Sequence, residues 1–562
     1  MVSPTWHLAA MRKALLALFS ILAAGLLAGC SENAAEANAP VVASTGQISP
    51  KSYKVSYYAA ARFAEQATFG PTPALIEEIR SKGFEQWIDE QFALPYTKIP
   101  EGPTKVRNRA IPPVAEVANF PIATWMNQTL TEPDQLRRRT VWSIGNFLVA
   151  SLSTGDPFGH VAWLNLLHQH SFGSYRELLK QASISPHMGF FLNNDQNRPK
   201  SAECPHCAPN ENFARELMQL FSVGVVKLNL DGTLQRDARG RAVETYSQTD
   251  VEELARVLTG WTRTYDPADP NGNNGTGWDT PMVPSKWAAE RDSGQKRVLG
   301  RTFAAGQDAP KDLDDAIDLL VTHANTAPFV STRLIQQLVK SNPSPEYVAR
   351  IARVFQDNGR GSVGDLKAVV KAILLDTEAR RGDDPARAQT MDGKFREPFL
   401  QHMAFARGLG CQRNFKAGDG GEFIPYRQRP FAPSSVFGFY APTDRAPGSN
   451  LLAPEQKLLN ANEFASRYGD PSWLLFGISG TNAQAAAGCN VAEFSNAMAQ
   501  SSTAYIELVS ARFFRGAMPP SLRSTLDQLN AEARGNGGFD AGNWSMVMLG
   551  FALATPSFGV IK

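Results

Sequence analysis

Apolar residues recur at intervals of three and four along most of the chain from residue 59 onward. This spacing is typical of helices that bury one face, whereas the strict alternation of strands is confined to short pieces such as Val223–Leu230. The pattern predicts a mainly α fold, a large multi-helical globular domain with long irregular loops and few short strands. The predicted helices include Ala59–Phe69, Thr72–Lys82, Phe84–Phe92, Gln135–Ser151, Val161–His170, Tyr175–Ser183, Pro209–Val223, Asp312–Val321, Val330–Lys340, Pro345–Gln356, Ser362–Leu375, Pro454–Arg467, Ala492–Val509 and Ser545–Ala554.

Pro209–Val223 is the helix that the pattern defines best. Its apolar side chains form one stripe, made of Phe213, Leu217, Leu220 and Phe221. Asn212 and Glu216 lie about 80–120° from the centre of this stripe, so we expect them at its edge, where a side chain can enter a cleft. Glu211 and Arg215 are four residues apart on the far side and predict a surface ion pair.

The next predicted helix begins at Ser247. Ser247 and Asp250 have the spacing of a capping box in which Asp takes the place of the usual Glu. Gly260 then ends the helix, and Trp261 follows at its exit.

Three consecutive arginines, Arg137, Arg138 and Arg139, stand near the start of the helix predicted from Gln135. Such a run predicts a solvated face or a salt-bridge network. A site for an anion is the alternative.

The first thirty residues have the features of an export signal. Arg12 and Lys13 precede an apolar run from Ala14 to Leu27. This run is shorter than the roughly 20 apolar residues that a transmembrane helix needs. The run ends in Leu-Ala-Gly-Cys30, an ending that resembles the signal of bacterial lipoproteins. We therefore expect Cys30 to be lipidated and to anchor the protein in the cell envelope, at the outer membrane. An ordinary signal peptide with an incidental Cys30 is the alternative.

Composition predicts the organisation of the chain. Residues 1–29 are the expected signal peptide, with 1–10 as an upstream extension, and residues 30–52 are the expected flexible tether. Residues 53–562 are expected to form one continuous unit. Its parts are a helical region over 53–265, a loop-rich insertion over 266–300, a helical region over 301–410, irregular loops over 411–455 and a C-terminal helical region over 456–562.

The charge of the chain excludes one class of partner. Lys and Arg number 56 and Asp and Glu number 54, and removal of residues 1–29 takes away two cations, so that the mature chain is neutral. A protein that tracks a phosphate backbone needs a strongly basic face. We therefore expect no nucleic-acid partner; the expected partners are the membrane, reached through Cys30, and an extracellular polymer or an envelope protein.

Four further cysteines, Cys204, Cys207, Cys411 and Cys489, are candidates for disulfides in an oxidising compartment. Of the three pairings, Cys204–Cys207 with Cys411–Cys489 is favoured because the first two are close in sequence. The Cys-Pro-His-Cys spacing also occurs in thiol oxidoreductases, and His206 offers a third metal ligand. Because no βαβ pattern surrounds it, a local disulfide is favoured over a redox centre or a metal site.

Several segments resemble the bacterial family called Domain of Unknown Function 1800, over roughly Ala59 to Phe558. The resemblance implies an exported, mostly helical bacterial protein. The segments that carry it include Arg62-Phe63, Phe69-Gly-Pro-Thr72, Gly83-Phe84, Trp87-Ile88, Gln135-Leu-Arg137, Arg139, His187-Met188, Asn210-Glu-Asn-Phe-Ala-Arg-Glu-Leu217, Leu258-Thr-Gly-Trp261, Gly393-Lys-Phe-Arg-Glu-Pro398 and Ala554-Thr-Pro-Ser-Phe558.

These segments and the edge of the Pro209 helix predict a polar cleft. Carboxylates for acid and base work, Arg and Asn for orientation, and an aromatic face for sugar rings suit the hydrolysis of a glycosidic or ester bond. The expected catalytic residues are Glu216, His187 and Asp250, with Glu211 as the alternative to Asp250 for the second carboxylate. The expected substrate-binding residues are Asn212, Arg137, Arg215 and Trp261. No metal is expected, and the sequence names no cofactor.

Two function classes follow. The favoured one is an envelope enzyme that hydrolyses an extracellular polymer, with carbohydrate as the favoured substrate. The alternative is a non-catalytic lipoprotein that binds a polymer or a protein partner, in which Arg137 and Glu216 belong to a buried ion-pair network. The nucleophile elbow of α/β-hydrolases, the phosphate-binding loop and the His-Glu-x-x-His zinc motif are absent from the sequence.

Overall fold

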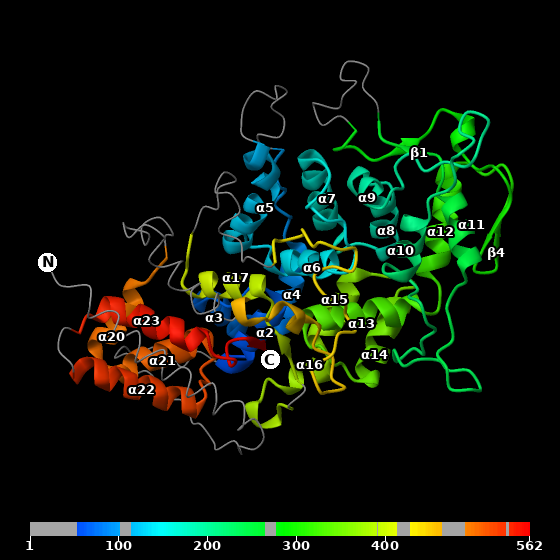
Figure 1. Cartoon of the computed structure of the whole chain (residues 1–562). Coiled ribbons are helices and arrows are strands. Elements are labelled where there is room, and N and C mark those ends of the chain that lie inside the picture. The colour runs from blue at the N-terminus through cyan, green and yellow to red at the C-terminus, as the bar shows by residue number, and fades with distance from the viewer. Residues whose placement is uncertain are drawn as a thin grey trace. The chain divides into compact units, whose positions relative to one another are not determined.

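Helices make up most of the regular structure in the computed structural model of this protein (Figure 1). The structure describes residues 53–101, 114–264, 277–389, 392–412, 428–463, 489–535 and 539–562. The predicted signal peptide, Cys30 and the tether lie outside these residues. The described elements confirm the predicted mainly α class.

The helices of the first half are α2 (Tyr57–Ala67), α3 (Pro73–Lys82), α4 (Phe84–Ala93), α5 (Val114–Thr131), α6 (Gln135–Gly145), α7 (Pro157–His170), α8 (Tyr175–Ser183), α9 (Pro186–Phe191), α10 (Glu211–Gln219) and α11 (Gln248–Val257). Those of the second half are α12 (Ala309–Val321), α13 (Thr326–Leu338), α14 (Pro345–Gln356), α15 (Leu366–Leu375), α16 (Thr377–Arg381), α17 (Pro398–Gly408), α20 (Ala492–Gln500), α21 (Ser502–Phe513), α22 (Pro520–Gly535) and α23 (Ala541–Leu553). Short 3₁₀ turns are η2 (Ala288–Glu290), η3 (Pro385–Arg387) and η4 (Pro454–Leu458).

Side-chain caps and glycines place many of the helix ends. Thr72 accepts a hydrogen bond from the backbone of Leu75 at the start of α3, and Gly83, with a φ of 80°, ends that helix. The predicted capping box at the start of α11 is confirmed, because Ser247 and Asp250 each bond the other's backbone N–H.

Several predicted helices are shorter in the structure. The helix predicted over Pro209–Val223 is α10, which Asn210 caps and which stops at Gln219. The one predicted over Gln135–Ser151 is α6, which ends at Gly145. Apolar periodicity runs on into the following turns because their side chains pack on the same core, so it overestimates helix length.

The strands are short and antiparallel. β1 (Trp261–Thr262) pairs with β2 (Val283–Pro284), β3 (Lys296–Val298) pairs with β4 (Arg301–Phe303), and β5 (Lys394–Phe395) pairs with β6 (Val560–Ile561). In the first pair Trp261 lies opposite Pro284. The piece predicted as strand-like, Val223–Leu230, contains only isolated bridges, such as Val226 with Glu244.

The three arginines of α6 are buried, so of the two predicted alternatives the solvated face is wrong, and the ion pair of Arg138 with Asp134 agrees with the other, a salt-bridge network. Arg138 Nε donates to Asp134 Oδ1 across 2.6 Å. Arg139 Nη2 donates to the carbonyl of Gln337, and Lys394 Nζ donates to the same carbonyl. Two segments that carry the family resemblance, far apart in the sequence, therefore meet at one carbonyl of α13 and join α6 to β5.

Contacts group Pro50–Lys562 into one unit. Within the described residues, no helix is both long and apolar enough to cross a membrane. The favoured cysteine pairing is the one found in the structure, with disulfides Cys204–Cys207 and Cys411–Cys489.

Candidate functional site

The segment from Asn193 to Asn197, which follows α9, has an unusual backbone. Asn193 and Gln196 both have a φ of 60°, in the left-handed region. This conformation costs a non-glycine residue about 1 kcal/mol or more and is concentrated at functional sites. We call this segment and the side chains that contact it the Asn193–Asn197 site.

Asparagine side chains join this segment to α10 and α11. Asn212 Nδ2 donates to Asn193 Oδ1 across 2.9 Å. The backbone N–H of Asn210, the N-cap of α10, donates to Asn197 Oδ1 across 2.7 Å, and Asn197 Nδ2 donates to the carbonyl of Ala255. The predicted site residue Asn212 and the N-cap of its helix, Asn210, therefore both contact this segment.

The segment also contacts β1 and the residue that follows it. The backbone N–H of Gln196 donates to the carbonyl of Trp261 across 2.9 Å. Arg263 Nε donates to Asp195 Oδ2 across 2.6 Å. The chain from Trp261 to Arg263 is thereby fixed to the segment at two points.

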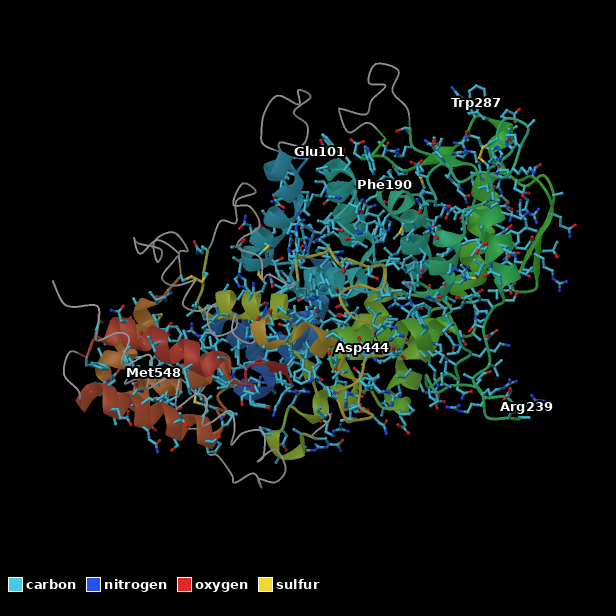
Figure 2. All side chains as sticks on the ribbon, viewed as in Figure 1. Glu101, Phe190, Arg239, Trp287, Asp444 and Met548 are labelled. Carbon is cyan, nitrogen blue, oxygen red and sulfur yellow. A yellow bond between two sulfur atoms is a disulfide. The ribbon has the colours of Figure 1, made fainter. Side chains whose placement is uncertain are left out.

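Aromatic side chains lie next to the Arg263–Asp195 pair. The Arg263 guanidinium stands 4.3 Å from the centre of the Trp278 ring, which meets Phe190 edge to face. Phe190 is 44% exposed, and Trp287, just beyond β2, is 62% exposed (Figure 2). Gly159 on α7 makes room, because a Cβ there would lie 2.9 Å from Trp278 Cε3.

His187 lies beneath this surface and is fully buried. Its ring meets that of His160 edge to face, with centroids 4.8 Å apart. Burial, with a smaller effect of the nearby His160, lowers the pKa of His187 to about 3. At neutral pH both rings are therefore uncharged, and His187 supports the surface from below rather than facing solvent.

Three buried polar atoms, one each on α10, the Asn193–Asn197 segment and β1, have no hydrogen-bond partner among the described residues. They are Glu216 Oε2, Asn194 Nδ2 and Trp261 Nε1. Glu216 is only 9% exposed, and burial raises the pKa of its carboxyl, against a smaller lowering by Arg215. Such atoms also occur elsewhere in the described chain, for example Trp87 Nε1 and Trp125 Nε1, so each of the three is a candidate ligand contact by itself and not part of a cluster peculiar to this site.

The other predicted residues are engaged in local contacts. Asp250 Oδ2 belongs to the cap of α11, and Asp250 Oδ1 accepts from the backbone of Leu299. Burial raises the pKa of Asp250, but the hydrogen bonds from Ser247 and Leu299 outweigh it and lower that pKa. Arg215 pairs with Glu211 across 2.7 Å, which confirms the predicted surface ion pair.

Arg137 makes its contacts elsewhere. Its Nη1 donates to the carbonyl of His168, and its guanidinium stands 4.4 Å from the centre of the Phe172 ring. Burial lowers the pKa of Arg137. None of these contacts joins Arg137 to the Asn193–Asn197 site.

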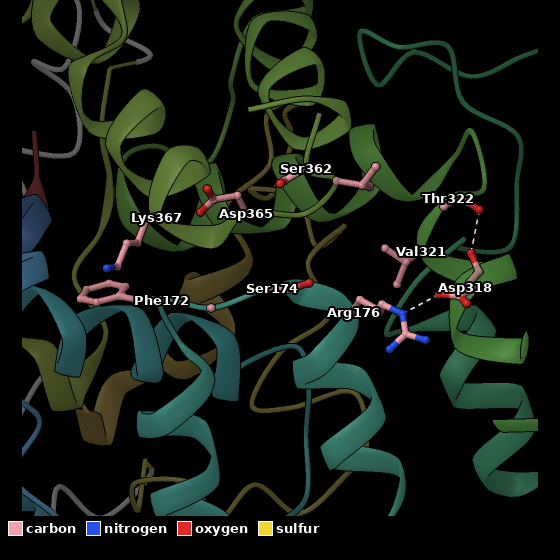
Figure 3. A pocket seen from close by; sticks show the side chains of 11 residues that line it. Phe172, Ser174, Arg176, Asp318, Val321, Thr322, Ser362, Asp365 and Lys367 are labelled. Carbon is pink, nitrogen blue, oxygen red and sulfur yellow. Dashed lines mark hydrogen bonds and ion pairs between the residues drawn. The ribbon is translucent and has the colours of Figure 1, made fainter. Parts of the chain in front are cut away.

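Phe172 also lines a pocket between α8, α12 and α15 (Figure 3). Arg176 reaches into this pocket, but Asp318 and Asp314 both pair with it. The residues predicted as catalytic or substrate-binding do not line the pocket. Within the ranges that the structure describes, no group of three or more His, Cys, Asp or Glu side chains has the arrangement of a metal site.

One family model matches this chain, over residues 62–560, and its description is "Protein of unknown function (DUF1800)". The chain belongs to the DUF1800 family. No curated protein and no solved structure matches it. In this DUF1800 chain, the segments that contain His187, Asn212 and Trp261 are among those that carry the resemblance, and the fold brings them to the Asn193–Asn197 site.

The sequence did not single out Phe190, Asp195, Arg263 or Trp278. Phe190 and Asp195 flank Asn193-Asn194, two adjacent asparagines that stand out in the sequence. Arg263 precedes and Trp278 follows a Gly/Asn-rich stretch, Asn271–Gly277, within the predicted loop-rich insertion. The signal that was available is the placement of a Trp beside such a stretch, since a large aromatic next to a loop often contacts a ligand.

Proposed function

We propose that this protein is exported, anchored to the cell envelope by lipid on Cys30, and hydrolyses an extracellular polymer, preferably a carbohydrate, at the Asn193–Asn197 site. The Leu-Ala-Gly-Cys30 ending supports the anchor. The two disulfides support an oxidising compartment, where such bonds persist.

The chemistry of the surface supports a carbohydrate. Amide groups such as that of Asn212 present both donors and acceptors, which suits the hydroxyl groups of a sugar. The exposed Phe190 offers a flat apolar face for a sugar ring, and Trp278, which meets it edge to face, has Arg263 over its own ring.

Glu216 carries the catalytic part of the proposal. A general acid in glycoside hydrolysis is a carboxyl that stays protonated near neutral pH, and burial without a hydrogen-bond partner raises the pKa of Glu216 in this direction. The second carboxylate is Asp195, since Asp250 is used in the cap of α11.

Binding without catalysis is the second candidate. It is favoured by His187, which is sealed from solvent and so does not exchange protons with a substrate at the surface. In this case the polar and aromatic groups recognise the polymer, and Glu216 helps to position α10.

The test is the release of soluble sugars from a panel of envelope and extracellular polysaccharides by the purified full-length protein in detergent. Glu216→Gln keeps the shape of the side chain and should lower kcat by about 10²- to 10⁴-fold while polymer binding is kept. Glu346→Gln, at an exposed position in the first turn of α14, is the matched control. Release at the wild-type rate by Glu216→Gln would reject Glu216 as the acid. Binding without release would favour the second candidate.

A further inference from the structure

The loop that connects the Asn193–Asn197 segment to α10 contains the Cys204–Cys207 disulfide. Both cysteines are half-buried, and the two residues between them, Pro205 and His206, are exposed. An attacking thiolate must reach a sulfur atom, so exposure at this position favours exchange.

The hydrogen bonds of the loop are local. Ser201 N–H and Cys207 N–H both donate to the carbonyl of Cys204, and Ser201 Oγ accepts from the N–H of Cys204. These bonds and the disulfide hold the same few residues in one turn. When the disulfide opens, this turn loses its covalent closure.

The second disulfide provides a contrast within the same chain. Cys411 is buried in the hydrophobic core, next to α17. Its bond to Cys489 joins residues 78 positions apart. Cys489 is half-buried, so a reductant can approach this disulfide from the Cys489 side alone, whereas neither cysteine of the Cys204–Cys207 pair is fully buried.

The turn is coupled to the candidate site at its C-terminal end. Asn210 follows three residues after Cys207; its N–H donates to Asn197 Oδ1, and its own Oδ1 accepts from the N–H of Asn212 as the cap of α10. At the other end, Arg198 pairs with Glu290 of η2. The conformation of the loop therefore bears directly on the first turn of α10.

The position of the Cys204–Cys207 disulfide distinguishes it from the active-site disulfide of a thiol oxidoreductase. In a thioredoxin-like catalyst the attacking cysteine stands at the N-terminus of a helix, which stabilises its thiolate. Here α10 begins at Glu211, beyond both cysteines. The pair therefore lacks the feature that makes such a motif an oxidant or reductant of other proteins.

We infer that Cys204–Cys207 is a reducible disulfide that exchanges with an external dithiol and controls the order of the first turn of α10. The dithiol's thiolate attacks one sulfur, the Cys204–Cys207 bond breaks, and the released thiolate takes a proton. The dithiol's second thiol then resolves the mixed disulfide. The dithiol loses two electrons and two protons to become a disulfide, and both cysteines become thiols. The effect on polymer binding rests on the proposed function; the exchange itself does not.

The exchange is tested on the folded full-length protein with dithiothreitol as the dithiol. New thiols are alkylated and located by mass spectrometry. Cys204 and Cys207 should be labelled at a concentration about tenfold below that which labels Cys411 and Cys489. Labelling of both pairs at the same concentration would overturn the inference, as would resistance of Cys204–Cys207 until the protein unfolds.

Hydrogen exchange then tests the coupling without any polymer. Reduction, or the double substitution Cys204→Ser with Cys207→Ser, should speed exchange at the Asn210 and Asn212 amides and leave α14 unchanged. The matched control is Cys411→Ser with Cys489→Ser, which should leave these two amides protected. Unchanged exchange at Asn210 and Asn212 after complete reduction would contradict the coupling, whatever the outcome of the sugar-release assay.

Discussion

Asn212 Nδ2 donates a hydrogen bond to Asn193 Oδ1 across 2.9 Å, and this bond joins the first turn of α10 to a residue with a left-handed backbone. The acceptor is a side chain on a strained residue, so its position is fixed by both the backbone and the bond. Substitutions at residue 193 can therefore separate the effect of backbone strain from the effect of the lost hydrogen-bond acceptor.

Asn193→Gly keeps the left-handed backbone and removes the acceptor, whereas Asn193→Ala removes the acceptor and adds strain. The Ala variant should be less stable than the Gly variant by about 1 kcal/mol in the free energy of unfolding. Both should weaken polymer binding to a similar degree. Equal stability of the two variants in urea denaturation would show that residue 193 does not require a positive φ.

The pair of buried histidines predicts loss of stability in acid. Burial lowers the pKa of His187 to about 3 and that of His160 to about 4, below the ordinary value of 6.5. As the pH falls below 6.5 the unfolded chain binds protons that the folded chain does not, so folding stability falls. The loss is about 1.4 kcal/mol per pH unit for each histidine, until the pH reaches its folded pKa.

Urea denaturation between pH 7 and pH 4 checks this slope. His187→Gln should make the stability curve flatter between pH 6 and pH 4, and His206→Gln, at an exposed position, should leave the slope as it is. An unchanged slope in His187→Gln would mean that this ring is protonated in the folded protein.

The two disulfides should contribute unequally to stability. In the chain-entropy description a closed loop stabilises the fold more as it lengthens. Replacement of Cys411 and Cys489 by Ser should cost about 4.5 kcal/mol, and replacement of Cys204 and Cys207 about 2 kcal/mol. Thermal or urea unfolding of the two double variants measures both values. A larger loss from the Cys204–Cys207 pair would contradict the assignment of this disulfide to a local turn.

Gly159 should be intolerant of a side chain. An added Cβ would lie 2.9 Å from Trp278 Cε3 and 3.4 Å from His187 Cβ. Gly159→Ala should therefore displace Trp278, destabilise the fold by about 1–3 kcal/mol and weaken polymer binding. Gly535→Ala, in the last turn of α22 with open space around it, should be neutral or stabilising by up to about 1 kcal/mol. Wild-type stability and binding in Gly159→Ala would show that Trp278 is free to move.

Many local features of the fold could be predicted from residues that are close together in the sequence. The capping box at Ser247 and the Glu211–Arg215 pair each depend on residues within four positions of one another, and each is found in the structure. Of the predicted stripe, Phe213 and Leu217 are buried on α10, whereas Leu220 and Phe221 lie beyond its end. The cysteine pairing was also predictable, because four cysteines permit only three arrangements.

The site was only partly predictable for a physical reason. Helical periodicity shows which face of α10 is buried, but it does not show what lies opposite that face. Arg137 and His187 were expected to meet, yet Arg137 contacts His168 and Phe172, and His187 contacts His160. The left-handed residues, Asn193 and Gln196, and the Arg263–Trp278 contact depend on tertiary packing, which spacing along the chain does not encode.

The central claim is that a polymer binds at the Asn193–Asn197 site. The most direct measurement compares the affinity of two exposed phenylalanine variants for the polysaccharide that the panel identifies, with the full-length protein in detergent. Phe190 is 44% exposed beside Trp278, and Phe437 is 49% exposed in the region between β5 and η4. Phe190→Ala should weaken binding by about tenfold or more, because stacking on an aromatic face is worth about 1 kcal/mol or more, and Phe437→Ala should bind as the wild type does. Equal affinities for the wild type and Phe190→Ala, or a loss confined to Phe437→Ala, would contradict the claim.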